Sequence, residues 1–332
     1  MMKFLKTSGQ DKLKLPYKLR SNQQKIIDTI VKGLTSKNHV VIEAPTGSGK
    51  TFTSLASALP FVTKKNYKII YCVRTNSQQK QVIRELKAFA KAGTKISVVA
   101  IQGRESMCPQ QKNDSELAKS NWSEKSKICK SLKLQSKMGE AGCPYYRKLL
   151  RPTKNLVENW SSKVYSAEEF TENAEKEGIC PYELNKLLLK EAQVVIVPYV
   201  YFFESFIRKY LLGWMNTSID NVITIVDEAH NLPDWSREAA SESLSIESLE
   251  RASHESEKFG LLMGDGTPPT FFLDLVGSAL KSLGEFHISE NDEEGLLPSH
   301  IVSLDSEVPT FETEMMSLGR MTLYKLKQQA SD

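Results

Sequence analysis

The stretch His39-Val-Val-Ile-Glu-Ala-Pro-Thr-Gly-Ser-Gly-Lys-Thr51 decides how this chain of 332 residues folds. Its first five residues form a short apolar run that predicts a buried strand. The Pro, Gly and Ser residues that follow predict a turn, and residues 50–59 have the composition of a helix. A strand, a glycine-rich turn and a helix in this order predict an α/β domain built on a parallel sheet.

The turn fits the phosphate-binding pattern G-x-x-x-x-G-K-[ST], except that Ala44 stands at the first glycine position. In such a loop, backbone N–H groups and the positive end of the helix dipole face the phosphates. Lys50 is expected to reach the β- and γ-phosphates, and the Thr51 hydroxyl to bind Mg²⁺. The nucleotide-binding residues predicted here are Ala44, Pro45, Thr46, Gly47, Ser48, Gly49, Lys50 and Thr51. The alternative is a glycine turn followed by a chance Lys-Thr pair.

A second candidate site follows the β-branched run at residues 222–226, which ends in Asp227-Glu-Ala-His230. Carboxylates at the C-terminal edge of a strand lie where open α/β sheets bind ligands. Asp227 is suited to the Mg²⁺ shell, and Glu228 to orienting and activating the attacking water. We therefore predict Lys50, Asp227 and Glu228 as the catalytic residues. An acidic turn after a core strand is the alternative reading.

These two motifs together resemble those of superfamily 2 helicases, and the cysteines between them resemble the XPD family of iron-sulfur DNA helicases, which includes DinG, FANCJ and RTEL relatives. Tyr17-Lys-Leu-Arg-Ser-Asn-Gln23 is similar to the family's adenine-contacting segment. The resemblance implies that Arg20, Gln23 and His230 belong to the nucleotide site. Val73-Arg-Thr-Asn-Ser-Gln78 is similar to the family's DNA-contacting segment, which implies DNA contacts by Arg74, Thr75 and Gln78.

All five cysteines lie between the two motifs, and four of them form a candidate metal site. Their separations are 21, 14 and 37 positions, without a C-x-x-C pair, so the spacing alone is a weak signal. Three of them directly precede proline, a pairing also found in ferredoxin cluster runs. Four thiolates suit Zn²⁺ or an iron-sulfur cluster, and the resemblance favours a 4Fe-4S cluster. The predicted ligands are Cys108, Cys129, Cys143 and Cys180. Cys72 lies in an apolar run and is expected in the core.

The net charge of +4 is unevenly distributed along the chain. Residues 1–230 have a net charge of +16, and residues 231–332 a net charge of −12. The segment 108–154 contributes +7, which suits contact with a nucleic-acid backbone. Four aromatic residues in or near this segment are candidate surfaces for base stacking. The alternative is that the lysines form a solvated face and the aromatic residues belong to the core. The four are Trp122, Tyr145, Tyr146 and Trp160.

Strands are expected at residues 39–44, 68–73, 95–101, 193–199 and 222–227, and helices at 22–34 and 79–90. With the resemblance, this predicts a RecA-like P-loop NTPase domain interrupted by the iron-sulfur insert and followed by part of a helical arch. The expected organisation is motor domain 1 at 1–104 and 181–235, the insert at 105–180 and the arch at 236–332. The mostly helical spacing of 236–258 and 270–286 agrees with the arch. A second motor domain is expected to be absent, so the chain is read as the N-terminal part of a helicase.

The resemblance implies an ATP hydrolase that moves along single-stranded or forked DNA in the 5′ to 3′ direction and acts in DNA repair as a monomeric motor. The expected cofactors are ATP, Mg²⁺ and the cluster. The chain alone is expected to hydrolyse ATP weakly, because an arginine from the second motor domain is missing. No signal peptide or membrane-spanning run is found in the sequence, so a cytoplasmic or nuclear location is expected. The alternatives are a non-catalytic ATP- and DNA-binding module and a small-substrate kinase or GTPase.

Overall fold

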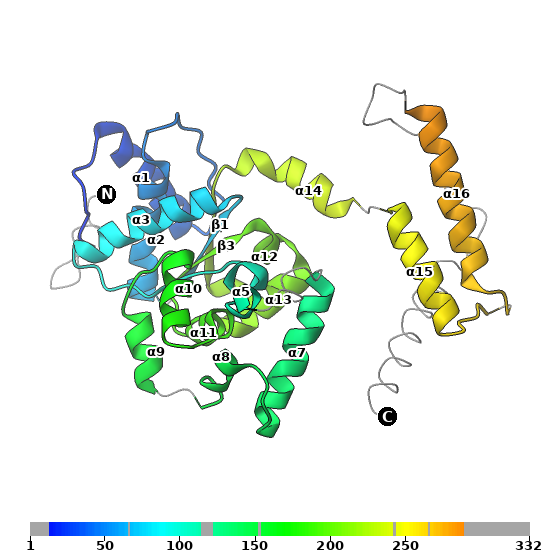
Figure 1. The fold of residues 1–332 in the computed structure, drawn as a ribbon. Helices are drawn as coiled ribbons and strands as arrows, with labels where there is room; N and C mark the ends of the chain where they lie inside the picture. The colour runs from blue at the N-terminus through cyan, green and yellow to red at the C-terminus, as the bar shows by residue number, and fades with distance from the viewer. Residues whose placement is uncertain are drawn as a thin grey trace. The chain divides into compact units, whose positions relative to one another are not determined.

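The structure is a computed structural model, and it describes residues 13–65, 67–113, 122–151, 154–241, 244–264 and 266–288. The chain divides into two compact units, residues 1–231 and residues 232–332. The predicted internal boundaries at 104/105, 180/181 and 235/236 stay predictions. Figure 1 shows the course of the chain through both units.

A four-stranded parallel sheet forms the centre of the first unit, with strand order β2-β3-β1-β4. The strands are β1 (Lys68–Val73), β2 (Val98–Ala100), β3 (Val194–Pro198) and β4 (Val222–Val226). Tyr71 of β1 lies in register with Ile196 of β3 and with Ile225 of β4. The β-branched runs fit strands that are covered on both faces. The predicted α/β class, the parallel sheet and four of the five predicted strands are confirmed.

The prediction of a buried strand at residues 39–44 was wrong. Among the described residues this segment pairs with no strand, and the Val41 side chain is 94% exposed. The chain reaches it through a tight turn, in which Lys37 has φ 55° and the Asn38 N–H donates to the Gly33 carbonyl at 2.9 Å. Val40 lies directly against Gly33. A Cβ atom added to Gly33 would lie only 2.1 Å from Cγ2 of Val40. One face of the segment is thus held by the preceding helix instead of by the sheet.

Three helices pack with the sheet to form the main core of this unit: α1 (Ser21–Thr35), α2 (Lys50–Lys65) and α3 (Asn76–Lys91). α2 contacts α1, α3 and β1. Phe52 of α2 stacks on Phe89 of α3 with ring centroids 5.6 Å apart. The predicted helices at 22–34, 50–59 and 79–90 are confirmed. Cys72 is fully buried in β1, as expected.

Between β2 and β3 the chain forms a set of helices from α4 to α11, residues 104–188. We call this observed set the insert; it extends beyond the predicted range 105–180. Figure 1 shows most of them, in cyan-green to green, gathered at one end of the unit. They are α4 (Arg104–Met107), α5 (Gln110–Asn113), α7 (Trp122–Met138), α8 (Pro144–Arg147), α9 (Lys154–Ser161), α10 (Ala167–Lys176) and α11 (Pro181–Leu188).

The chain then passes through β3 to α12 (Tyr199–Phe203) and α13 (Ser205–Trp214), and a 3₁₀ turn (Ile219–Asn221) precedes β4. Lys68 ties these segments to the sheet because its ammonium group donates to the carbonyls of Lys190 at 2.6 Å and Met215 at 2.7 Å. After β4, the 3₁₀ turn Ala229–Asn231 ends the first unit. The edges of β1, β3 and β4 are thereby fixed relative to one another.

The second unit contains α14 (Leu232–Ala240), α15 (Ile246–Lys258) and α16 (Pro269–His287). The expected helical spacing at 236–258 is therefore divided between two helices. α15 and α16 pack against each other, and Ser253 Oγ donates to Asp274 Oδ1 at 3.0 Å. Residues 289–332 of the expected arch lie outside the described residues. No helix among the described residues combines the length and apolar composition needed to cross a bilayer.

Candidate nucleotide site and cysteine pocket

The glycine-rich loop runs directly into the N-terminus of α2, as predicted. Gly47 and Gly49 have φ values of +80° and +86°, which side-chain-bearing residues rarely adopt. The Ser48 N–H donates to the Pro45 carbonyl at 3.2 Å and closes the turn. The loop therefore presents small residues and backbone N–H groups at a helix N-terminus, the arrangement that binds phosphate.

Two side chains of the α1 segment contact this loop. Gln23 Nε2 donates to the Ser48 carbonyl at 3.0 Å, and Arg20 Nη1 donates to the Gly47 carbonyl at 3.4 Å. Gln23 is buried and also accepts a hydrogen bond from the Arg20 N–H at 3.1 Å. The Ser48 hydroxyl is buried and has no hydrogen-bond partner within the described part of the chain. The structure thus brings Arg20 and Gln23 to the loop, and it leaves one polar group there for a ligand.

The acidic tetrad lies at the other side of the same site. Lys50 Nζ lies 3.2 Å from Glu228 Oε1 and 3.3 Å from the Ala44 carbonyl oxygen. The Asp227 N–H donates to the Cys72 carbonyl at 3.0 Å, so the sheet pairing of β1 with β4 extends to Asp227. Burial, together with the neighbouring Glu228 charge, raises the pKa of Asp227, and the Lys50 charge opposes that shift. The three predicted catalytic residues are thus brought together.

Sequence reasoning missed Tyr199, which begins α12 at the end of the neighbouring strand β3. Its hydroxyl donates to the Asp227 carbonyl and lies 3.2 Å from the Glu228 carbonyl oxygen. Burial and the charge of Asp227 raise the pKa of Tyr199 to about 12, so the hydroxyl keeps its proton. The signal in the sequence was a tyrosine directly after the strand, at the same sheet edge as the tetrad.

Glu228 has a backbone φ of +48°, in the left-handed region that residues other than glycine rarely adopt. His230 Nδ1 lies 3.3 Å from the second carboxylate oxygen of Glu228, and the His230 side chain is 72% exposed. Asn231, which was also missed, donates from both its backbone N–H and its Nδ2 to the Glu228 carbonyl at 3.0 Å. This turn therefore fixes the Glu228 backbone in an uncommon conformation.

The predicted DNA-contacting residues follow β1 directly. Arg74 is exposed, and its Nη1 donates to Asn231 Oδ1 at 2.7 Å. Thr75 is the N-cap of α3 and accepts from the Gln78 N–H at 3.3 Å, while Gln78 Oε1 accepts from the N–H groups of Arg74 and Thr75. Thr75 and Gln78 therefore cap this helix, and the Arg74 side chain is the exposed cation at its start.

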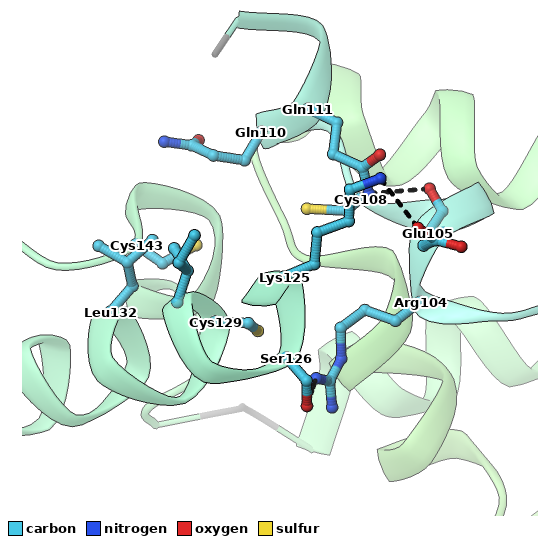
Figure 2. A pocket seen from close by; sticks show the side chains of 11 residues that line it. Arg104, Glu105, Cys108, Gln110, Gln111, Lys125, Ser126, Cys129, Leu132 and Cys143 are labelled. Carbon is cyan, nitrogen blue, oxygen red and sulfur yellow. Dashed lines mark hydrogen bonds and ion pairs between the residues drawn. The ribbon is translucent and has the colours of Figure 1, made fainter. Parts of the chain in front are cut away.

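Three of the four predicted metal ligands line one pocket, which Figure 2 shows from close by. They come from different elements: Cys108 follows α4, Cys129 lies in α7, and Cys143 precedes α8. The Cys143 N–H donates to the Leu132 carbonyl at 3.2 Å and to Ser136 Oγ at 2.8 Å, which ties α8 to α7.

The fourth cysteine, Cys180, is the N-cap of α11, and its N–H donates to the Tyr145 carbonyl at 3.0 Å. Proline follows Cys143 and Cys180 at the first residue of α8 and of α11. This placement agrees with the fixed φ of proline and its missing N–H, because neither impairs the first turn of a helix. The proline after each of these cysteines therefore starts a helix directly behind the thiol.

The thiols lie close enough to affect one another. Burial raises the pKa of Cys108, the Gln110 and Gln111 N–H groups oppose this, and Cys129 and Cys143 add to it. Burial, with smaller contributions from Glu183, Cys143 and Cys108, raises the pKa of Cys180 to about 12. No three described His, Cys, Asp or Glu side chains are placed to hold a single metal ion. The four thiols thus converge on one region without forming a single-ion site.

Cationic groups surround this region. Arg104 lines the pocket, donates from Nη1 to Ser126 Oγ at 3.1 Å, and lies over the Tyr182 ring at 5.0 Å. Its Nε is buried, and within the described ranges it has no hydrogen-bond partner. Burial raises the pKa of Cys129, whereas the charges of Arg104 and Lys133 oppose that shift. An anionic group held by the thiols would therefore meet positive charge and an unused donor.

The position of Trp160 in the insert does not suit the base-stacking hypothesis. Trp160 is only 5% exposed and packs against Tyr165 and Phe170, with ring centroids 5.4 and 4.9 Å away. It is a core residue, because Tyr165, and Phe170 of α10, pack against its ring. Tyr146 is partly buried under Lys133 Nζ, 5.6 Å from its ring centre. The Trp122 side chain lies outside the described residues.

Comparisons with known proteins agree with this architecture. The DEAD_2 family model matches residues 71–249. The chain is 26% identical over 280 residues to the Regulator of telomere elongation helicase 1 homolog of Arabidopsis thaliana, an alignment that covers 74% of this chain and 26% of that protein. It is 25% identical over 274 residues to the Regulator of telomere elongation helicase 1 of Mus spretus, an alignment that covers 69% of this chain and 21% of that protein. The chain thus spans about a quarter of the length of the curated relatives it matches.

A solved structure described as XPD_Helicase superposes with a TM-score of 0.50 at 21% sequence identity, covering 93% of this chain and 48% of that chain. This likeness supports the RecA-like fold. The match to the DEAD_2 model begins inside β1, includes the insert and the acidic tetrad, and ends within α15, so that it spans more than half of the chain. The resemblance to XPD-type helicases is thereby confirmed, and the chain belongs to the DEAD_2 family.

Proposed function

We propose that this chain contains the ATP-binding motor domain of a DNA helicase. The observation that supports this most strongly is the 3.2 Å approach of Lys50 Nζ to Glu228 Oε1, because it brings a phosphate-binding lysine and a water-activating carboxylate to one sheet edge. The family match runs from inside β1 through the tetrad and so includes Glu228, whereas Lys50 lies before its first matched residue.

In this proposal the loop residues 44–51 bind the phosphates of ATP, and Arg20 and Gln23 hold the loop from α1. The Thr51 hydroxyl and the Asp227 carboxylate would hold Mg²⁺, which would neutralise phosphate charge. The carboxylate of Glu228 accepts a proton from the attacking water, and His230 contacts that carboxylate. When the γ-phosphate binds Lys50, the Lys50–Glu228 ion pair opens and Glu228 becomes available to water.

Single-stranded DNA is the proposed nucleic-acid ligand, with Arg74 as the phosphate contact and with Thr75 and Gln78 placing it through the cap of α3. The net charge of +16 over residues 1–230 favours a polyanionic partner. The 5′ to 3′ direction and a role in DNA repair follow from the resemblance to XPD-type helicases. Strong hydrolysis requires an arginine from a second motor domain, so weak turnover is proposed for these 332 residues alone.

We also propose that the insert holds a 4Fe-4S cluster through Cys108, Cys129, Cys143 and Cys180. In such a cluster each cysteine binds a different iron atom, so four thiolates lie farther apart than the ligands of one ion. Three of these thiols line one pocket, and Cys180 is the N-cap of α11 beside it in the insert. The cluster would make the insert rigid. The buried Nε of Arg104 is placed to donate to the anionic group, and Zn²⁺ remains the alternative metal.

The test is ATP hydrolysis with and without single-stranded DNA, measured for the wild-type chain and for Glu228→Gln, each supplied with a second motor domain. We expect DNA-stimulated hydrolysis in the wild type and a loss of at least a hundredfold in the variant, because the proton acceptor is removed. Glu158→Gln, at an exposed position of α9, is the matched control and should retain wild-type turnover. Hydrolysis that survives in Glu228→Gln would contradict the proposed catalytic role.

DNA binding without ATP hydrolysis, even when a second motor domain is supplied, would favour the alternative of a non-catalytic binding module.

A further inference from the structure

A chain of hydrogen bonds connects Arg74, at the end of β1, to the backbone of Glu228. Arg74 Nη1 donates to Asn231 Oδ1 at 2.7 Å, and Asn231 Nδ2 donates to the Glu228 carbonyl at 3.0 Å. One amide side chain thus uses its acceptor for the guanidinium and its donor for the acidic turn. Arg74 is exposed at the other end of this chain and is accessible to an anion.

The position of the Glu228 backbone matters because its left-handed φ of +48° is unfavourable for a residue with a Cβ atom. Such a conformation persists where surrounding contacts hold it. Its carbonyl receives the Asn231 backbone N–H and Nδ2, both at 3.0 Å, and the Tyr199 hydroxyl at 3.2 Å. A change at Asn231 therefore changes how firmly the Glu228 carboxylate is directed at Lys50.

We propose that Asn231 is a positioning residue that couples the binding of a nucleic-acid phosphate at Arg74 to the binding of nucleotide beside Glu228. The inference rests on the proposed function. A phosphate forms charge-assisted hydrogen bonds with a guanidinium that are stronger than the bond to a neutral amide oxygen. Bound phosphate therefore competes with Asn231 for Arg74, and the freed amide alters the restraint on the Glu228 turn.

Thermodynamic linkage makes this coupling measurable without hydrolysis. If nucleic acid changes the affinity for nucleotide by some factor, nucleotide must change the affinity for nucleic acid by the same factor. The dissociation constant of a non-hydrolysable ATP analogue in Mg²⁺ is measured for the 332-residue chain with and without saturating oligothymidine at fixed salt. In the wild type, we expect the two dissociation constants, with and without oligothymidine, to differ by a ratio of about fivefold or more, the lower end of typical allosteric couplings.

Two variants test the role of the side chain. Asn231→Ala removes every side-chain contact of Asn231, to Arg74, to the Glu228 carbonyl and to the His230 ring 3.3 Å away. Asn231→Asp keeps an oxygen for Arg74 and loses the Nδ2 donor. Both are expected to bring the ratio close to one. Asn221→Ala is the matched control, because Asn221 is exposed, lies before β4 and bonds locally to Ser218 Oγ. It should keep the wild-type ratio, and Asn231→Asp, the isosteric change, reports on the coupling if the alanine variant does not fold.

The outcomes separate the inference from the proposed function. If the wild type binds neither ligand, the proposed function fails. If it binds both with a ratio of one, or if both Asn231 variants keep the wild-type ratio, Asn231 does not couple the sites and only the inference is overturned. A double variant of Asn231→Ala with Arg74→Gln should change the ratio no further than the stronger single variant, because both residues act in one chain.

Discussion

The ammonium group of Lys50 lies 3.2 Å from the carboxylate of Glu228, and this ion pair joins the N-terminus of α2 to the turn after β4. Both side chains are about one third exposed, so the pair itself contributes only about 0–1 kcal/mol to stability. A phosphate that enters the loop can therefore replace Glu228 as the partner of Lys50 at small cost. The pair is more important for the geometry of the site than for the stability of the fold.

The two left-handed glycines of the loop provide a matched comparison. Gly47→Ala should lower the free energy of unfolding by about 1–2 kcal/mol because of its φ of +80°, although its Cβ would meet nothing within 4 Å. Gly49→Ala should cost roughly 1 kcal/mol more, since its Cβ would lie 2.5 Å from Gln23 Nε2 and displace the hydrogen bond to Ser48. Urea unfolding of both variants measures the difference, and equal losses would contradict the role of Gln23.

The ion pair between Lys133 of α7 and Glu183 of α11 should stabilise the insert. Lys133 Nζ lies 2.8 Å from Glu183 Oε1, and the two side chains are only 20% and 12% exposed. Glu183→Gln should therefore lower the free energy of unfolding by roughly 1–3 kcal/mol at pH 7, because it leaves a half-buried ammonium group without its counter-charge. Glu158→Gln, which breaks the exposed pair with Lys154, is the control and should have little effect.

The same variant predicts a pH dependence. Burial alone would raise the pKa of Glu183, but the hydrogen bond from Lys133 and the charges of Lys186 and Lys133 hold it below its ordinary value. A lowered carboxylate pKa adds stability above the unfolded pKa, and that stability is lost as the pH falls through the folded pKa. The difference in the free energy of unfolding between the wild type and Glu183→Gln should thus be largest at neutral pH and should shrink in acid. A difference that widens in acid would be the opposite result.

Tyr199→Phe removes the hydroxyl that bonds the Asp227 and Glu228 carbonyls. The free energy of unfolding should fall by about 1 kcal/mol, because one buried hydrogen bond is lost. ATP turnover should fall through kcat more than through KM, since the hydroxyl supports the Glu228 turn. Tyr210→Phe, at a half-exposed position of α13, should change neither quantity. A normal kcat in Tyr199→Phe would argue against a positioning role.

Protein purified without oxygen should contain four iron and four sulfide ions per chain and absorb visible light, as a 4Fe-4S cluster requires. Cys143→Ser should lose most of this iron, whereas Cys72→Ala should keep it, because Cys72 is buried in β1. Removal of the iron should lower the thermal midpoint, since the metal bonds link α7, α8 and α11. A colourless protein with one zinc ion would establish the zinc alternative.

The sequence predicted four strands because their β-branched runs fit a doubly covered parallel sheet. It predicted Lys50, Asp227 and Glu228 as the catalytic residues from the phosphate-loop and acidic motifs. The segment 39–44 has a similar composition, yet it is held by Gly33 of α1 and pairs with no described strand. Apolar composition alone does not distinguish a paired strand from an extended segment against a helix.

The roles of Tyr199 and Asn231 could not be predicted, because both bind backbone carbonyls of a turn whose conformation no residue pattern encodes. The left-handed φ of Glu228 is likewise a property of the folded turn. Trp160 is a candidate for base stacking by its aromatic ring and its nearby lysines, but only the fold shows that Tyr165 and Phe170 bury it. Side chains that act through backbone groups therefore require the structure.

The most direct test of the nucleotide site is an equilibrium titration of the 332-residue chain with a fluorescent ATP analogue in Mg²⁺. The wild type should bind, and Lys50→Ala should bind at least tenfold more weakly, since a charged hydrogen bond to phosphate contributes roughly 1.5–3 kcal/mol. Equal affinity of wild type and Lys50→Ala would contradict the assignment of the loop.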